Sequence, residues 1–353
     1  MASGESRNTV WIDCAKLLAI LGVLIDHCKG ILYEGETVQY LSFFSVSVFF
    51  FLSGMTSYYS LERRGKGEGL ARWTGRRLVR ILVPYCVAVA VCQYVRSGTL
   101  DLGAFVRWTV NFNLEGQFYF VLIYLQFILA APILYLVVAA CRRGKPRFLT
   151  RGIFLVAAWE CSLFCIHHTF ALETYGGGNY LLGGTYFFLF VMGMIAADMR
   201  IAFTRSKQAA GALLLAAVLY CISMAWMLKD RFAWDESVFG WVLRVNPPGP
   251  TLILYALAVL FLVFSACSLA CLMQNRWLNR LLAAASWLGR RTLYIFLYHM
   301  LILDCLLPRL PFAREMGPVK TAVYMAAMVG LPVAGKEACD RIKAGLLRGL
   351  EEG

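Results

Sequence analysis

The sequence predicts an all-α polytopic membrane protein, a bundle of about ten transmembrane helices with both termini in the cytoplasm. Of its 353 residues, 60% are hydrophobic and 16% are charged, whereas about a quarter of a soluble domain is charged. Apolar segments recur at about the 20 residues that a helix needs to cross the hydrocarbon core. They cover residues 9–32, 38–60, 78–96, 117–140, 151–171, 180–199, 208–228, 250–272, 287–307 and 318–335.

The placement of basic residues predicts the topology. With a cytoplasmic N-terminus, 24 of the 34 Lys and Arg residues fall on the cytoplasmic side, 9 fall outside, and Lys16 lies within a span. Cytoplasmic loops of membrane proteins are enriched in Lys and Arg. We therefore expect a multi-pass protein of the cell membrane, with the lipid bilayer as a partner and no nucleic acid. We also expect one integral-membrane domain over 1–353, without an appended soluble domain.

The connections between spans differ in character. Residues 61–77 form a strongly basic polar loop, and residues 97–116 suit a short interfacial helix. Three successive glycines make 172–179 irregular. The outer loop 229–249 and Glu115 offer possible sugar contacts, although interfacial aromatics and solvated acids explain them equally well. These loop candidates are Trp234, Asp235, Glu236 and Trp241. The twelve cysteines favour packing, and we expect no metal site.

The first apolar segment, VWIDCAKLLAILGVLIDH, carries four ionisable residues. A helix turns about 100° per residue, so Asp13, Lys16 and His27 share one face, with Lys16 and His27 about 16 Å apart along the axis. Asp26 lies about 100° from His27. Ionisable groups at membrane depth usually face a bundle interior or wet cavity and indicate function. The alternative is that Asp13 and Lys16 form a structural ion pair near the inner interface, with Lys16 snorkelling.

Five motifs follow one another along residues 7 to 301. In the first motif, the basic residue Lys16 is followed, after ten residues, by His27. The other four are SVSVFFFLSGMTSYYS, with Ser53 and Gly54; GRRLVRILVPY, with Arg77 and Arg80; GQFYFVLIYLQFILAAPIL, with Tyr119; and LGRRTLYIFLYHMLI, with His299. Together they resemble the acyltransferase 3 family of integral-membrane O-acyltransferases. Many members have Trp where Tyr119 stands, which is a departure from the family pattern.

The resemblance implies an acyltransferase that moves an acyl group, usually acetyl, from a cytosolic acyl-CoA to a hydroxyl of a cell-envelope glycan or related acceptor. Acetyl-CoA or another acyl-CoA is then a co-substrate, and no cofactor is bound. The resemblance also implies that His27 is catalytic and that the arginine motif acts in function. Arg binds phosphate through charge-assisted hydrogen bonds, so we assign Lys16, Arg77 and Arg80 to the donor.

Two chemical routes remain open. His27 acts as a general base on the acceptor hydroxyl, or it carries a covalent acyl group, with Asp26 as its expected partner. His299 either lines the cavity or makes a hydrogen bond between helices. The remaining cavity candidates are Asp13, Ser53 and Tyr119. A transporter or flippase is the alternative function, but it predicts two related halves with broken helices, and the prolines within spans are not symmetrically placed.

Overall fold

The structure, a computed structural model, describes residues 9–64, 67–169, 174, 179–230, 244–309 and 317–351. Most of the segment 172–179 and of the loop 229–249, including its four sugar-contact candidates, lies outside these residues. The described residues form helices and no named strand, which confirms the all-α prediction. The α-helices are α2 (Val10–His27), α3 (Glu36–Ser42), α4 (Phe44–Glu62), α5 (Leu70–Ser97), α6 (Leu102–Asn111), α7 (Tyr119–Arg143), α8 (Arg147–Ile166), α9 (Tyr186–Met199), α10 (Ser206–Asp230), α11 (Pro250–Met273), α12 (Arg276–Gly289), α13 (Thr292–Leu301) and α14 (Pro318–Glu351).

Eight helical segments among the described residues are long and apolar enough to cross a membrane, which supports a multi-pass membrane protein. The other two predicted spans correspond to α2 and α9. The helix α2 carries Asp13, Lys16 and Asp26. The helix α9 has 14 residues, a length of about 21 Å, which is shorter than the hydrocarbon core of about 30 Å. The number of ten spans therefore stays a prediction.

The structure refines several predicted boundaries. The segment 287–307 is not one helix, because α12 ends at Gly289 and α13 begins at Thr292. After α13 the chain continues through a π-helical turn, η4 (Ile302–Leu306), and a short 3-10 turn, η5 (Leu307–Arg309). The helix expected within 97–116 is present as α6, and the Asp101 side chain caps its N-terminus. The last helix runs well past residue 335, to Glu351.

The non-helical start of the predicted span 180–199 explains why α9 is short. Gly183 and Gly184 have φ values of 61° and 60°, a region that glycine adopts without steric cost. The backbone N–H of the preceding Leu182 donates to Gln126 Oε1 at 2.8 Å. Non-helical backbone at membrane depth requires such a partner inside the protein, so Gln126 on α7 stabilises the non-helical segment before α9.

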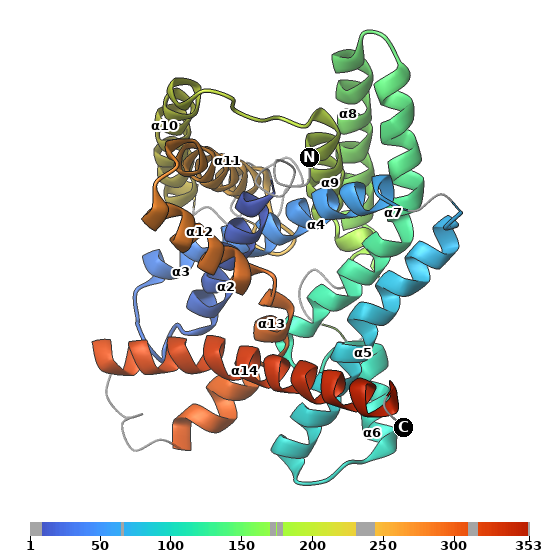
Figure 1. Cartoon of the computed structure of the whole chain (residues 1–353), viewed down its shortest axis with the longest axis vertical. Helices are drawn as coiled ribbons and strands as arrows, with labels where there is room; N and C mark the ends of the chain where they lie inside the picture. The colour runs from blue at the N-terminus through green and yellow to red at the C-terminus, as the bar shows by residue number, and fades with distance from the viewer. Residues whose placement is uncertain are drawn as a thin grey trace.

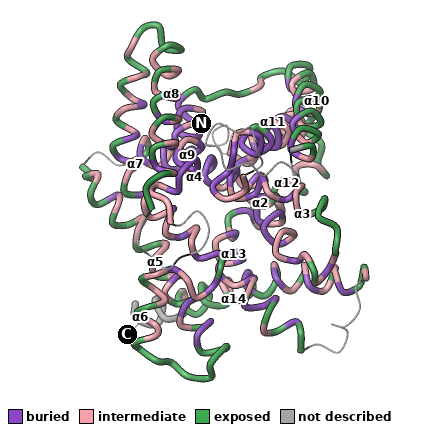
Figure 2. The backbone as a smooth tube through the Cα atoms, turned by 180° about the vertical axis from the view of Figure 1, so that it is seen from behind, coloured by how far each residue is buried: buried purple, intermediate pink, exposed green. Residues whose placement is uncertain are grey.

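The core of the bundle is built around α4 and α9, whose residues are largely buried in Figure 2. These helices cross at two glycines. A Cβ on Gly54 would lie 2.0 Å from the Phe190 carbonyl oxygen, and a Cβ on Gly193 would lie 2.0 Å from the Phe51 carbonyl oxygen. Small residues let helix backbones approach closely in membrane proteins. The glycine of the LSG sequence in the second predicted span is therefore a packing residue.

The first helix lies at the centre of the molecule, where α2 contacts α3, α4, α11, α12 and α13 (Figure 1). Its contact with α12 is close, because a Cβ on Gly289 would lie 1.9 Å from the Asp13 carbonyl oxygen. The other end of α2 packs beside α13. The ionisable residues of α2 therefore face other helices, as the cost of lipid exposure predicts.

Candidate active site

A pair of histidines joins the end of α2 to α13. His27 Nδ1 lies 2.8 Å from His299 Nε2, and the planes of the two rings differ by 5°. His299 is fully buried, whereas His27 is half-buried. The residues are 272 positions apart in sequence. The helix-to-helix hydrogen bond considered for His299 is therefore present, and its partner is the residue with the strongest catalytic expectation.

Two further contacts hold the end of α2. The Tyr33 hydroxyl donates to the Ile25 carbonyl at 2.6 Å, and burial raises the pKa of Tyr33 to about 12, so this donor keeps its proton. The Asp26 carboxylate accepts a hydrogen bond from Gln39 Nε2 at 2.9 Å. No hydrogen bond joins Asp26 to His27 among the described residues, and the role of Asp26 as the partner of His27 stays a prediction. The roughly 100° between their helical positions lets each side chain reach a different neighbour.

The segment 61–77, predicted to be a loop, is a loop only between α4 and α5, because α5 begins at Leu70. A cavity of about 590 Å³ lies beside this connection, on the side predicted to be cytoplasmic. It carries an excess of positive charge over its two acidic residues, and Arg76 forms an ion pair with Glu68 at its edge. Such an excess favours an anionic ligand. The charged lining residues are Asp13, Lys16, Arg63, Arg64, Glu68 and Arg76.

A second cavity, of about 320 Å³, shares Lys16 and Thr56 with the first. Arg77 lines it and donates to the Thr56 carbonyl at 3.3 Å. The remaining lining includes Ser53, Arg290 and several apolar or aromatic side chains: Phe49, Ile81, Phe120, Tyr124, Leu293 and Phe296. Phe296 lies three residues before His299, and its carbonyl is 2.8 Å from His299 Nδ1, so one lining residue of this cavity contacts the histidine pair.

The two charges in the first half of α2 lie in different surroundings. Asp13 is 3.8 Å from Lys16, and it also accepts from Ser286 at 2.9 Å and lies 3.9 Å from Arg290. These contacts fix α2 against α12 and the residue that follows it, which agrees with the structural interpretation of Asp13. Lys16 differs because it borders both cavities.

The other predicted site residues are dispersed. Arg80 is exposed and does not line either cavity, although Arg77, one helical turn earlier, does. Ser53 lines the second cavity while its hydroxyl donates to the Phe49 carbonyl within α4 at 2.7 Å. Tyr119 is half-buried and packs against the larger core cluster. The structure thus brings Lys16, Ser53 and Arg77 to one cavity and leaves Arg80 and Tyr119 outside it.

A comparison with known families decides the class of protein. The model of an acyltransferase domain family matches residues 9–336, nearly the whole chain. The chain belongs to the acyltransferase 3 family. It is therefore a multi-pass membrane protein and a membrane O-acyltransferase. Comparisons with curated proteins and with solved structures found no significant match.

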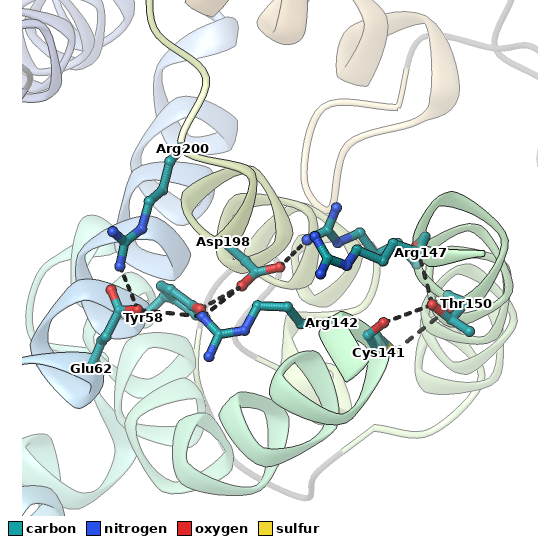
Figure 3. A network of polar contacts seen from close by, with 9 residues as sticks. Tyr58, Glu62, Cys141, Arg142, Arg147, Thr150, Asp198 and Arg200 are labelled. Atoms are coloured by element: carbon teal, nitrogen blue, oxygen red, sulfur yellow. Dashed lines mark hydrogen bonds and ion pairs between the residues drawn. The ribbon is translucent and has the colours of Figure 1, made fainter. Parts of the chain in front are cut away.

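Sequence reasoning missed an ion-pair network in this acyltransferase, shown in Figure 3. The Asp198 side chain is fully buried and contacts Arg151, while Arg142 lies 3.8 Å away and the Tyr58 hydroxyl donates to it at 2.6 Å. Glu62 extends the network to Arg142 and Arg200. The network joins α4, α7 and α8 to the end of α9. An acidic residue within the predicted span 180–199 was the available signal.

A second missed network lies at the C-terminal end of α5. Arg96 makes two hydrogen bonds to Glu115, at 2.7 and 2.8 Å, and one to Asp304 on η4 at 3.0 Å. Burial raises the pKa of Glu115, although Arg96 opposes the shift. The carboxylate considered for sugar binding is thus bonded within the protein, and Arg96 links this residue before α7 to η4, the turn that follows α13.

Proposed function

We propose that this acyltransferase moves an acyl group, acetyl in the simplest case, from a cytosolic acyl-CoA to a hydroxyl of a cell-envelope glycan or related acceptor. One observation carries the proposal: the basic cavity and the second cavity share Lys16 and Thr56, and the second reaches the turn that precedes His299. This arrangement supports a path for an extended donor from the predicted cytoplasmic side toward the histidine pair.

The chemistry of the two cavities fits the two parts of an acyl-CoA. The phosphates would lie in the first cavity, where Lys16, Arg63 and Arg64 provide positive charge. The thioester arm is uncharged and would extend through the second cavity, past Phe49, Phe120 and Phe296. Arg77 lies in the second cavity, and its cation adds to the positive charge around the donor.

In the direct route, His27 is the general base for the acceptor. It takes the proton of the acceptor hydroxyl as that oxygen attacks the thioester carbon. The carbon–sulfur bond then breaks, and the thiolate leaves with the proton that His27 returns. The products are the O-acyl ester and CoA with a free thiol. In the covalent route, the His27 nitrogen attacks the thioester carbon, the carbon–sulfur bond breaks and the thiolate leaves. The acceptor oxygen then attacks the acyl carbon, the carbon–nitrogen bond breaks, and the hydroxyl proton is passed to the thiolate, so that the products are the same.

The test is acyl transfer by purified protein in liposomes, with radiolabelled acetyl-CoA outside and water or an added glycan as acceptor. We expect His27→Ala to lower the rate by at least about 100-fold, because general acid–base catalysis contributes about 10²–10⁴. His168→Ala is the matched control, since His168 is exposed and distant in sequence from the pair. A folded His27→Ala protein with the normal rate would contradict the proposal, and acyl-independent movement of a solute would favour transport.

A further inference from the structure

The hydrogen bonds of the histidine pair restrict where its protons lie. His299 Nδ1 lies 2.8 Å from the Phe296 carbonyl oxygen, and His299 Nε2 lies 2.8 Å from His27 Nδ1. A carbonyl oxygen only accepts hydrogen bonds, so the contact with Phe296 requires a proton on His299 Nδ1. In a neutral imidazole the other nitrogen then has a lone pair and accepts.

The proton position on His299 also determines the proton position on His27. Because His299 Nε2 is an acceptor, the proton between the rings belongs to His27 Nδ1. In neutral His27 the lone pair must then be on Nε2. The opposite arrangement would need protons on both nitrogens of His299, hence a charged ring that is fully buried, and an isolated buried charge is strongly unfavourable.

We infer that His299 is a positioning residue, which holds His27 in the tautomer with the proton on Nδ1 and thereby leaves the Nε2 lone pair as the reactive base or nucleophile. This inference rests on the proposed function, because both acyl-transfer routes need an unprotonated nitrogen. The inference also identifies Nε2 as the reactive nitrogen of His27. Nδ1 is hydrogen-bonded to His299, whereas no hydrogen bond to His27 Nε2 occurs among the described residues.

The surroundings of the pair support a fixed orientation. His299 is fully buried and bonded to its own helix, and Tyr33 caps the last turn of α2 at Ile25. Among the charged groups of the described residues, Asp26 on α2 and Asp304 on η4 act electrostatically on His27. Their carboxylates are held by Gln39 and by Arg96. The ring of His27 is therefore oriented by His299 and not by a carboxylate.

Solid-state ¹⁵N NMR of the protein in lipid bilayers tests the tautomer directly. The chain has four histidines, so a protein with His167→Gln and His168→Gln leaves the pair as the only source of imidazole signals. We expect both rings to be neutral with protonated Nδ1 and unprotonated Nε2. A His27 ring that is protonated at Nε2 in this protein would overturn the inference.

A pair of variants tests the positioning role kinetically. The Gln side chain of His299→Gln places an amide oxygen near the former Nε2 and can accept from His27 Nδ1. The side chain of His299→Met has a similar length and lacks a comparable acceptor. We expect His299→Met to lower kcat by at least about tenfold with little change in KM, since loss of the correct histidine tautomer costs about 10⁴ in a serine protease. His299→Gln should recover much of this loss.

The two readouts separate the inference from the proposed function. The NMR signals need no turnover, so the expected tautomer in a protein without acyl transfer would overturn the proposed function alone. Normal acyl transfer by a protein whose His27 carries its proton on Nε2 would overturn the inference alone. Equal kcat values for folded His299→Met and His299→Gln would also overturn the positioning role. If His299→Met does not fold, the NMR spectrum and His299→Gln still decide.

Discussion

The substitution Asp198→Asn tests the buried ion-pair network of Figure 3. The carboxylate is fully buried and is shared by Arg151, whose side chain is 16% exposed, and by Arg142. Removing one partner of a buried ion pair costs about 3–5 kcal/mol, because the other charge stays buried without compensation. For cooperative unfolding of a chain of this length, the loss corresponds to a drop in the midpoint of about 4–7 °C.

The assay is thermal unfolding of the purified protein in detergent, followed by tryptophan fluorescence. Asp340→Asn is the matched control, since Asp340 is 56% exposed and pairs with Lys336 one turn earlier. Exposed pairs contribute about 0–1 kcal/mol, so we expect a shift of about 1 °C or less. The double variant Asp198→Asn with Arg151→Gln should lose less than the sum of the two single variants. Equal midpoints for Asp198→Asn, Asp340→Asn and the unmodified protein would refute this reasoning.

Two further predictions concern packing and the donor. In Gly54→Ala the new Cβ would lie 2.0 Å from the Phe190 carbonyl oxygen, so we expect a lower yield of monodisperse protein on size-exclusion chromatography. Gly211→Ala, with nothing within 4 Å of its Cβ, is the control, and an equal yield from both would contradict the close crossing of α4 and α9. Lys16→Ala removes a cation that borders both cavities. We expect the KM for acyl-CoA to rise by about 10–100-fold, because a hydrogen bond to a charged group contributes about 1.5–3 kcal/mol. The exposed Lys207→Ala should leave KM unchanged, and an unchanged KM in Lys16→Ala would remove Lys16 from the donor site.

The length of the apolar runs alone located most of the helices, because a span needs an apolar run whatever its neighbours are. The helix α12 was missed as a separate element because its mixed composition lies between two apolar segments, and only the break after Gly289 separates it from α13. The length of α9 was overestimated. Apolar residues precede it, but Leu182 and Gly183 adopt a backbone that is bonded to Gln126 on another helix.

The site could be predicted in part. Helical arithmetic placed Asp13, Lys16 and His27 on one face, and motif spacing singled out His27. Neither argument separated Arg77 from Arg80. The two residues are three positions apart, so they lie only about 60° apart around a helix. Their exposures differ because Arg77 faces the second cavity and Arg80 does not.

The sequence by itself determined the class of this protein: an all-α membrane acyltransferase, read from apolar segments, the distribution of Lys and Arg, and five ordered motifs. Local composition and spacing are sufficient for those features. Only the tertiary structure decided the partners. In the structure His299 forms a hydrogen bond with His27, Gln39 forms one with Asp26, and two arginines form ion pairs with Asp198. Contacts between residues far apart in sequence depend on how helices pack, and packing is set by close approaches such as those at Gly54 and Gly289.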